Sequence, residues 1–267
     1  STTVLGRAQF PTNAGVRMFE IFVLTGRKQY DTLAKLAADM LASDADPGNR
    51  ANTAFWLREI AFIRGRGAEG LRLAENAYAV EEARGNPMPI LLRPVDSAWA
   101  GIWHLEQPTR AVQRLDAARA RPAVRSLPVD DRRYIDLMVL YAQAGRPDRA
   151  RAVLAEYQAA GAADTAYRRR TTPGYHLAMG EIALAERRPA DAIREFRLFD
   201  RLPDGPRDSC LACTLEALGR AFDLAGMADS AIVTYERYVA TPSSFTWPDS
   251  YALARAHRRL GELYDAK

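Results

Sequence analysis

The chain has 267 residues, of which 48% are hydrophobic and 26% charged, so it can bury a sizeable core in one or two domains. It contains no apolar run of the length that a membrane helix needs and no stretch with the layout of a signal peptide, so no membrane span is predicted. The net charge is +4, but the 37 basic residues are interspersed with 33 acidic ones. Because a nucleic-acid footprint clusters its cations, this pattern disfavours nucleic-acid binding.

Turns between helices are predicted at a regular spacing along the chain. Each follows an apolar stretch with helical periodicity. The six positions are Gly26, Gly65, Glu106, Gly145, Arg187 and Gly226. The intervals between them are 39, 41, 39, 42 and 39 residues. A period of this kind indicates an array in which one two-helix unit is repeated.

Small residues and prolines recur at fixed distances after these turns. Five residues after a turn stand Gly70, Ala111, Ala150, Ala192 and Ala231, whereas the first copy has Asp31. Two residues after three of the turns stand Pro108, Pro147 and Pro189, and proline suits the first position of a helix. Further helix starts are expected at the polar residues near Asp130, Thr172–Pro173 and Asp249.

The stretch from Leu215 to Pro242 resembles the tetratricopeptide (TPR) repeat. The residues that carry the resemblance are Leu215, Leu218, Gly219, Phe222, Ala231, Tyr235 and Pro242. It implies an all-α, right-handed superhelical array of about six helical hairpins plus a single C-terminal helix over residues 251–265. The charged face of that last helix, with Arg255, Arg258, Arg259 and Glu262, is expected to face solvent. We expect residues 1–267 to form one repeat domain and, since the chain starts at Ser1, to be a fragment of a longer protein.

The last three copies are similar to the C-terminal TPR tails of bacterial signalling proteins such as serine/threonine kinases and adenylate cyclases. The matching residues are Cys210, Cys213, 218–223, 225–226, 229–232, 235–238 and 260–264. The resemblance implies a partner-sensing module of a bacterial regulator, in the cytoplasm or in the extracytoplasmic part of a membrane-bound protein. The kinase and cyclase residues are not in this sequence, so neither activity is expected of it.

Cys210 and Cys213 form the sharpest local motif. Their three-residue spacing at a predicted helix start brings the two sulfurs close together. The pattern fits two free thiols, a disulfide or part of a metal site. A zinc site needs about two further ligands, and His176 is the only plausible one, so no metal is expected. We predict that the two cysteines can pair under oxidising conditions.

No catalytic or cofactor site is predicted. Gly65, Gly67 and Gly70 match the spacing of a dinucleotide-binding turn, which works only between a strand and a helix. The residues before Gly65 have helical spacing, so a repeat turn is favoured. The histidines stand apart from one another and from any nucleophile; they are His104, His176 and His257. We therefore expect a protein that is not an enzyme and has no cofactor.

In a TPR array the first helix of each pair lines a concave groove, and the residue six positions before each turn should point into it. Together with neighbouring aromatic and charged residues this predicts a partner-binding groove made by Glu20, Glu59, Phe62, Trp103, His104, Arg132, Glu181 and Arg220. A mixed aromatic and acidic groove would bind a protein or peptide segment that carries Lys or Arg. The favoured function is a non-catalytic protein-interaction scaffold or sensor. The alternatives are a nucleic-acid-binding helical-repeat protein and a solvated helix face without a ligand.

Overall fold

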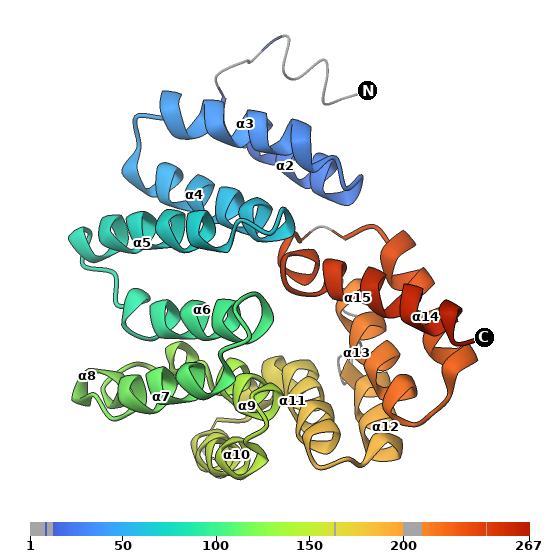
Figure 1. Ribbon diagram of the computed structural model, residues 1–267. Helices are drawn as coiled ribbons and strands as arrows, with labels where there is room; N and C mark the ends of the chain where they lie inside the picture. The colour runs from blue at the N-terminus through green and yellow to red at the C-terminus, as the bar shows by residue number, and fades with distance from the viewer. Residues whose placement is uncertain (1–8, 10–12, 163, 200–209, 244) are drawn as a thin grey trace. The chain divides into compact units, whose positions relative to one another are not determined.

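The computed structural model describes residues 9, 13–162, 164–199, 210–243 and 245–267, and the regular structure in these ranges is helical throughout (Figure 1). No strand occurs in them, which confirms the all-α prediction. The chain divides into two compact units. Unit 1 comprises residues 1–86 and 242–250, and unit 2 comprises residues 87–241 and 251–267.

From residue 13 onward, unit 1 consists of four helices and a short segment from much later in the chain. The helices are α2 (Ala14–Gly26), α3 (Tyr30–Ser43), α4 (Pro47–Ile63) and α5 (Gly67–Ala83), and each packs against the next. Ile21, Leu33 and Ile60 are fully buried between α2, α3 and α4. Asp46 caps α4, because its side chain accepts a hydrogen bond of 2.8 Å from the backbone N–H of Asn49.

Unit 2 contains the remaining helices. They are α6 (Pro89–Trp103), α7 (Pro108–Arg119), α8 (Pro122–Arg125), the 3₁₀ helix η1 (Val129–Arg132), α9 (Tyr134–Gln143), α10 (Pro147–Ala162), α11 (Thr165–Ala185), α12 (Pro189–Phe199), α13 (Leu211–Leu224), α14 (Ala228–Ala240) and α15 (Trp247–Asp265). The first turn of α15 belongs to unit 1 and the rest of that helix to unit 2. Helices on either side of a short turn pack against each other: α6 on α7, α9 on α10, α11 on α12 and α13 on α14. The first helices of successive pairs also meet, since α6 contacts α9 and α9 contacts α11.

The turns recur with one backbone geometry. The turn residue has a positive φ at Gly65 (71°), Glu106 (52°), Gly145 (74°), Arg187 (58°) and Gly226 (71°). After Gly65 and Gly226, the next residue donates its N–H to a carbonyl five positions earlier, as Met227 does to Phe222 at 3.0 Å. This hydrogen bond closes the preceding helix in a Schellman motif. Five of the six predicted turn positions are thereby confirmed.

The first turn differs from the prediction. Its positive-φ residue is Lys28 (φ 53°), whereas Gly26 is the last residue of α2. The closing bond runs from Gln29 N–H to the Leu24 carbonyl at 3.0 Å, which places this turn two residues later than Gly26. A glycine near a helix end therefore misled the prediction. With the register corrected, Phe22 and not Glu20 occupies the position six residues before the turn.

Close approach within a helix pair depends on a residue without a side chain. A Cβ atom on Gly219 would lie 2.6 Å from Cε1 of Tyr235, so only glycine lets α13 and α14 approach this closely. In the α4–α5 pair the glycine is on the second helix and the aromatic ring on the first. Gly70 of α5 leaves space that the ring of Phe62 of α4 occupies. Prolines begin α7, α10 and α12, as expected from Pro108, Pro147 and Pro189.

Three predicted helix starts are displaced. Helix α11 begins at Thr165, where Asp164 accepts a hydrogen bond of 2.8 Å from the Tyr167 N–H, so Pro173 lies inside the helix and not at its start. Asp130 lies in η1, and the last helix begins four residues before position 251. A proline in the sequence can stand at the first position of a helix or, less often, inside one. Here the N-cap at Asp164 shows that α11 starts earlier and that Pro173 is an interior residue.

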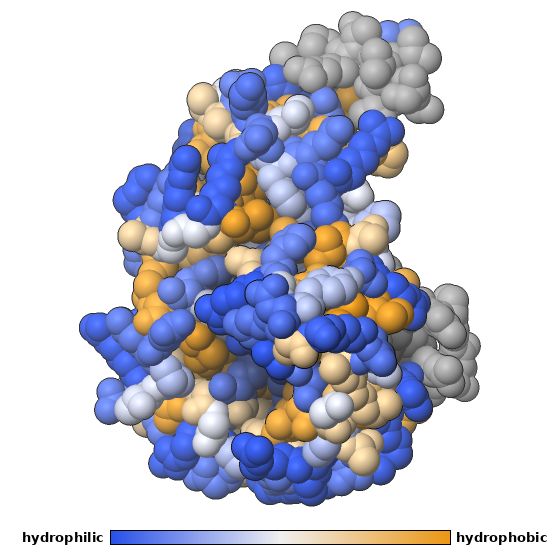
Figure 2. Space-filling model, turned by 45° about the vertical axis from the view of Figure 1, so that its right-hand side comes forward, coloured by the Kyte–Doolittle hydropathy of each residue, from blue (hydrophilic) through white to orange (hydrophobic). Residues whose placement is uncertain are grey.

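The described helices include none that combines the length and the apolar character required to cross a membrane. The face shown in Figure 2 is mainly hydrophilic, and apolar side chains appear on it as separate patches. Single exposed apolar residues of this kind are common on folded proteins.

Candidate functional site

Three of the predicted groove residues meet in unit 2. Trp103 at the end of α6, Glu181 of α11 and Arg220 of α13 belong to one hydrogen-bonded network, although 39 residues separate the last two in sequence. Each residue lies on the first helix of a pair. Stacking of successive pairs therefore brings equivalent faces of the repeats together, as expected for a repeat array.

Gln143 links the indole of Trp103 to the carboxylate of Glu181. The indole Nε1–H donates to Gln143 Oε1 at 2.8 Å, and the Gln143 amide donates to Glu181 Oε1 at 3.0 Å. Gln143 is the last residue of α9, so the chain of hydrogen bonds runs from α6 through α9 to α11. These bonds fix the plane of the Trp103 ring, since an indole has only one donor to satisfy.

Arg220 joins two carboxylates. Its Nη1 donates to Glu181 Oε2 at 3.0 Å, and its Nε donates to Glu216 Oε1 at 2.7 Å. Burial alone would lower the pKa of Arg220, but the charges of Glu181 and Glu216 outweigh it and raise that pKa well above the usual value. Glu181 is only 2% exposed, so its charge depends on these partners.

Arg255 of α15 lies over the face of Trp103, with its guanidinium carbon 3.9 Å from the ring centroid. This is a close cation–π contact. Its nearest carboxylate among the described residues, that of Glu216, is 4.0 Å away and is already bonded to Arg220. Burial and the neighbouring charge of Arg220 lower the pKa of Arg255. Arg255 therefore presents a weakly compensated cation beside an aromatic ring.

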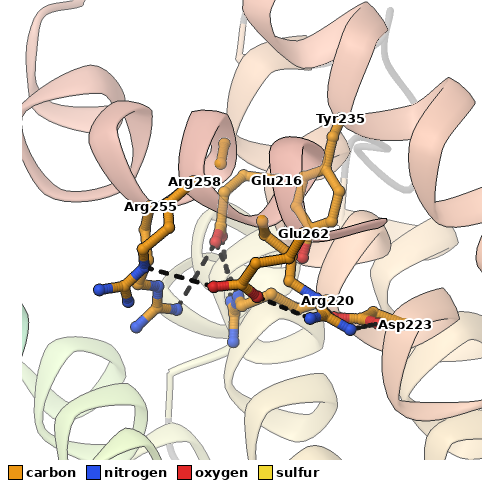
Figure 3. A pocket seen from close by; sticks show the side chains of 9 residues that line it. Glu216, Arg220, Asp223, Tyr235, Arg255, Arg258 and Glu262 are labelled. Carbon is orange, nitrogen blue, oxygen red and sulfur yellow. Dashed lines mark hydrogen bonds and ion pairs between the residues drawn. The ribbon is translucent and has the colours of Figure 1, made fainter. Parts of the chain in front are cut away.

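A small pocket of about 230 Å³ lies next to this network, between α13, α14 and α15 (Figure 3). Arg259 closes one side through two hydrogen bonds to Asp223, at 2.7 and 2.8 Å, and a third to Glu262 at 2.7 Å. The face of the last helix that was expected to meet solvent is therefore only partly exposed. Arg255 contacts Trp103 and Arg259 bonds to Asp223, both within unit 2, whereas Arg258 is exposed.

Three aromatic rings form a partly exposed surface beside Arg255, which we call the aromatic surface: Trp99, Trp103 and Tyr251. Trp99 stacks on Tyr251, with centroids 5.0 Å apart and planes inclined by 26°, and its centroid is 6.1 Å from that of Trp103. The predicted groove residue His104 lies at its edge, 6.1 Å from the Tyr251 ring. Offset stacking of this kind holds the rings in fixed positions.

Three other predicted groove residues lie outside the aromatic surface: Glu59, Phe62 and Arg132. Glu59 is 4% exposed and bonds to Arg58 and to the Ser250 hydroxyl within unit 1. Phe62 is buried against Gly70, and Arg132 lies in η1, where its guanidinium donates to backbone carbonyls. We expected Glu59 and Glu181 to project into a groove, but both carboxylates are buried and bonded to other side chains of the protein. Whether these residues contribute to partner binding stays a prediction.

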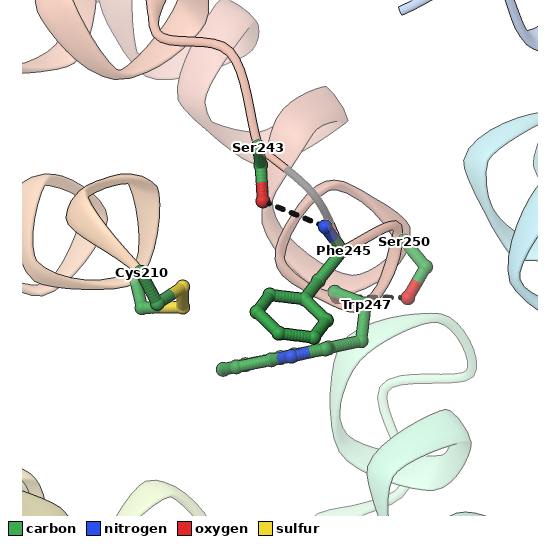
Figure 4. Close-up of a disulfide and its surroundings, with 6 residues drawn as sticks. Cys210, Ser243, Phe245, Trp247 and Ser250 are labelled. Atoms are coloured by element: carbon green, nitrogen blue, oxygen red, sulfur yellow. Dashed lines mark hydrogen bonds between the residues drawn. A yellow bond between two sulfur atoms is a disulfide. The ribbon is translucent and has the colours of Figure 1, made fainter. Parts of the chain in front are cut away.

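Cys210 and Cys213 are joined by a disulfide (Figure 4). Cys210 is the residue just before α13, and its Cα lies 5.4 Å from that of Cys213 in the first turn of the helix. Both cysteines are buried and pack with Phe199. In the same view, the backbone N–H of Phe245 donates to the Ser243 hydroxyl at 3.1 Å within unit 1.

No family model, no curated protein and no solved structure matches the chain. The function must therefore be argued from the geometry of the site.

Two kinds of site considered from the sequence can be compared with the structure. Residues 60–63 before Gly65 are helical, so the turn that a dinucleotide needs is not formed there. In the described part of the chain, no three His, Cys, Asp or Glu residues are grouped so that they could hold a metal ion. His176 pairs with Glu195 at 2.9 Å. What the site offers is a fixed aromatic surface with an adjacent cation.

Sequence reasoning missed four contributors to the site: Trp99, Gln143, Tyr251 and Arg255. A signal existed for Trp99, because it lies one helical turn before Trp103 and so shares its face. Arg255 and Tyr251 were assigned to the solvated last helix, and no local pattern in the sequence indicates what that helix packs against.

Proposed function

We propose that this chain is a non-catalytic protein-interaction module, arranged as a TPR-like superhelical array of two-helix repeats in a bacterial regulatory protein. The regular turns support this arrangement. Gly65, Glu106, Gly145, Arg187 and Gly226 share one backbone geometry and follow one another at intervals of 39 to 42 residues. Arrays of this kind present the first helices of successive pairs as a continuous binding surface.

The observation that carries the proposal is the aromatic surface. Trp99, Trp103 and Tyr251 are only partly buried, and hydrogen bonding and stacking hold their rings in place. Rigid aromatic side chains lose little conformational entropy when a partner binds. Trp, Tyr and Arg are the residues that most often dominate the binding energy of an interface.

The charges of the site favour an acidic partner segment over the basic one expected from the sequence. The carboxylate of Glu181 is buried and bonded to Arg220 and Gln143, so it has little capacity for a further cation. Arg255 has only a distant ion pair and borders the aromatic surface. The proposed ligand is a peptide segment that places an apolar or aromatic side chain on the rings and an Asp or Glu at Arg255.

A peptide-display selection on the immobilised chain tests this function. We expect the selected peptides to combine an apolar or aromatic residue with an acidic one. Their affinity should fall about tenfold with Arg255→Ala, which corresponds to roughly 1.4 kcal/mol. Arg258→Ala is the matched control, because it removes the same charge one turn away on the exposed face of α15.

Two outcomes would count against the proposal. One is a selection without a shared sequence pattern; the other is equal affinity of the selected peptides for both variants and the unchanged protein. Binding of single-stranded RNA that depends on Trp103 would instead support the alternative of a nucleic-acid-binding repeat protein, since exposed aromatic rings also stack on bases.

A further inference from the structure

A second pocket lies in unit 2 and shares no lining residue with the aromatic surface. It has a volume of about 550 Å³ and is enclosed by residues of α7, α8, η1, α9 and α10. Its lining includes four arginines but only two acidic residues. We call it the arginine pocket: Arg119, Arg125, Arg132 and Arg149, with Asp116 and Glu156. Its size is that of a site for a small molecule.

The two acidic residues are already engaged. Glu156 accepts a hydrogen bond of 2.6 Å from Arg119. Asp116 accepts one of 2.7 Å from the hydroxyl of Tyr141 and lies 3.7 Å from Arg149. Each carboxylate therefore balances one arginine, and the charges of Arg125 and Arg132 remain in excess.

Arg132 is held rigidly but without an acidic partner. Its Nε donates to the Leu127 carbonyl at 2.9 Å and its Nη2 to the Arg125 carbonyl at 3.0 Å, while Nη1 lies 3.4 Å from the Tyr134 hydroxyl. These bonds use three of the five N–H groups of a guanidinium, which leaves one on each terminal nitrogen. No carboxylate of the described residues pairs with this cation. Its position is therefore set by the backbone.

Arg125 is more accessible. Its side chain is exposed and forms neither a hydrogen bond nor an ion pair with any residue in the described ranges. Arg149 is exposed as well, with Asp116 at 3.7 Å as its acidic neighbour. The pocket thus combines one fixed guanidinium with two that can move onto a ligand.

Part of the lining is apolar. Val124, Tyr134 and Leu137 are buried side chains whose surfaces contribute to the pocket wall. A ligand that fills the volume therefore meets both charged and apolar side chains. An inorganic anion alone would leave the apolar wall uncovered.

We propose that the arginine pocket binds a small organic phosphate, with the phosphate on Arg125, Arg132 and Arg149 and an apolar or aromatic group against Val124 and Leu137. A phosphate monoester carries close to two negative charges at neutral pH, which match the two positive charges in excess. The planar fork of a guanidinium also suits phosphate oxygens. This site is independent of the aromatic surface, so it adds a small-molecule ligand to a protein-binding module.

Calorimetric titration of the full chain tests the proposal with four probes: phenyl phosphate, adenosine monophosphate, inorganic phosphate and phenol. We expect at least one of the two organic phosphates to bind more than tenfold tighter than inorganic phosphate, and phenol to show no measurable binding. Higher salt should weaken the binding, because the contacts are between charges at the surface.

Variants connect that binding to the pocket. Arg125→Gln and Arg149→Gln should each weaken the organic phosphate at least tenfold, whereas Arg237→Gln on the exposed face of α14 should not. These positions are exposed, so circular dichroism should be unchanged, and Arg132 is left intact because it also supports the backbone. Absence of binding by both organic phosphates would overturn the proposal. Organic phosphates that bind no tighter than inorganic phosphate would also overturn it. So would unchanged affinity of the organic phosphates for both Arg125→Gln and Arg149→Gln.

Discussion

Glu59 in unit 1 and Glu181 in unit 2 occupy equivalent places in their repeats, yet the structure uses them differently. Each lies six residues before a positive-φ turn residue, Gly65 or Arg187, and each is almost fully buried. Glu181 bonds to Gln143 and Arg220, which belong to the preceding and the following helix pair. Glu59 bonds to its neighbour Arg58 and to Ser250, which is 191 residues away in sequence.

The difference shows that one repeat position can serve two kinds of connection. Glu181 connects consecutive repeats along the array, so its partners can be inferred from the period. Glu59 instead accepts a hydrogen bond from Ser250, which belongs to the distant segment 242–250 of unit 1. A second hydrogen bond, from the Tyr30 hydroxyl to Asp249, holds the same segment. The following experiments separate these two roles.

Removing the carboxylate of Glu181 should have the largest effect. Glu181→Ala leaves the partly buried Arg220 with one carboxylate in place of two and removes the acceptor of the Gln143 amide. Loss of one partner of a buried ion pair costs about 3–5 kcal/mol when nothing compensates the other charge, and since Glu216 remains we expect about 3 kcal/mol. Urea unfolding followed by circular dichroism measures this loss. Glu262→Ala, at an exposed position of α15, should stay within about 0.5 kcal/mol of the unchanged protein. A cost below about 1 kcal/mol for Glu181→Ala would show that the network adds little to stability.

Loss of the Ser250 hydroxyl should have a smaller effect, confined to unit 1. Ser250→Ala removes a hydrogen bond to the charged Glu59, worth about 1.5–3 kcal/mol, but Arg58 remains to compensate the carboxylate. Hydrogen exchange should show faster exchange in α4 and at the start of α15, with the core of α9 and α10 unaffected. Equal acceleration in both units would contradict the separation of roles. Ser126→Ala, at an exposed position of unit 2, is the control.

The smallest effect concerns the pH dependence contributed by Tyr30. Burial, followed by the charge of Asp249, raises the pKa of this tyrosine above its ordinary value near 10. Above pH 10 the unfolded chain loses the phenol proton while the folded chain keeps it, so the stability from Tyr30 is complete below pH 10 and declines as the pH rises further. The free energy of unfolding should therefore fall less steeply above pH 10 in Tyr30→Phe than in the unchanged protein.

Other buried tyrosines also titrate in this range, including Tyr141, whose pKa burial raises to about 12. Only the difference between Tyr30→Phe and the unchanged protein is therefore diagnostic, and we expect it to be about 1 kcal/mol near neutral pH. Parallel curves for the two proteins from pH 9 to pH 11 would show that Tyr30 does not contribute to the pH dependence.

The turns could be predicted from sequence because each needs the same backbone conformation at the same interval. The regular interval identified the turns at Glu106 and Arg187, although neither residue is a glycine. It failed at the first turn, because Gly26 was taken as the turn residue and the positive φ is at Lys28. Arg220 could have been recognised as the partner of Glu181, since the two are one repeat apart. Ser250 could not have been paired with Glu59, because no periodic pattern connects a repeat to a segment 191 residues away.

The path of the chain through unit 1 has a consequence for biosynthesis. The bonds from Ser250 to Glu59 and from Asp249 to Tyr30 span 191 and 219 residues, so unit 1 cannot complete its contacts until residue 250 has left the ribosome. At ordinary rates of translation the earlier helices wait roughly 10 to 40 s for that segment, while the helices of unit 2 are being made. During this interval Tyr30 lacks Asp249 and Glu59 lacks Ser250, although Arg58 is already beside Glu59.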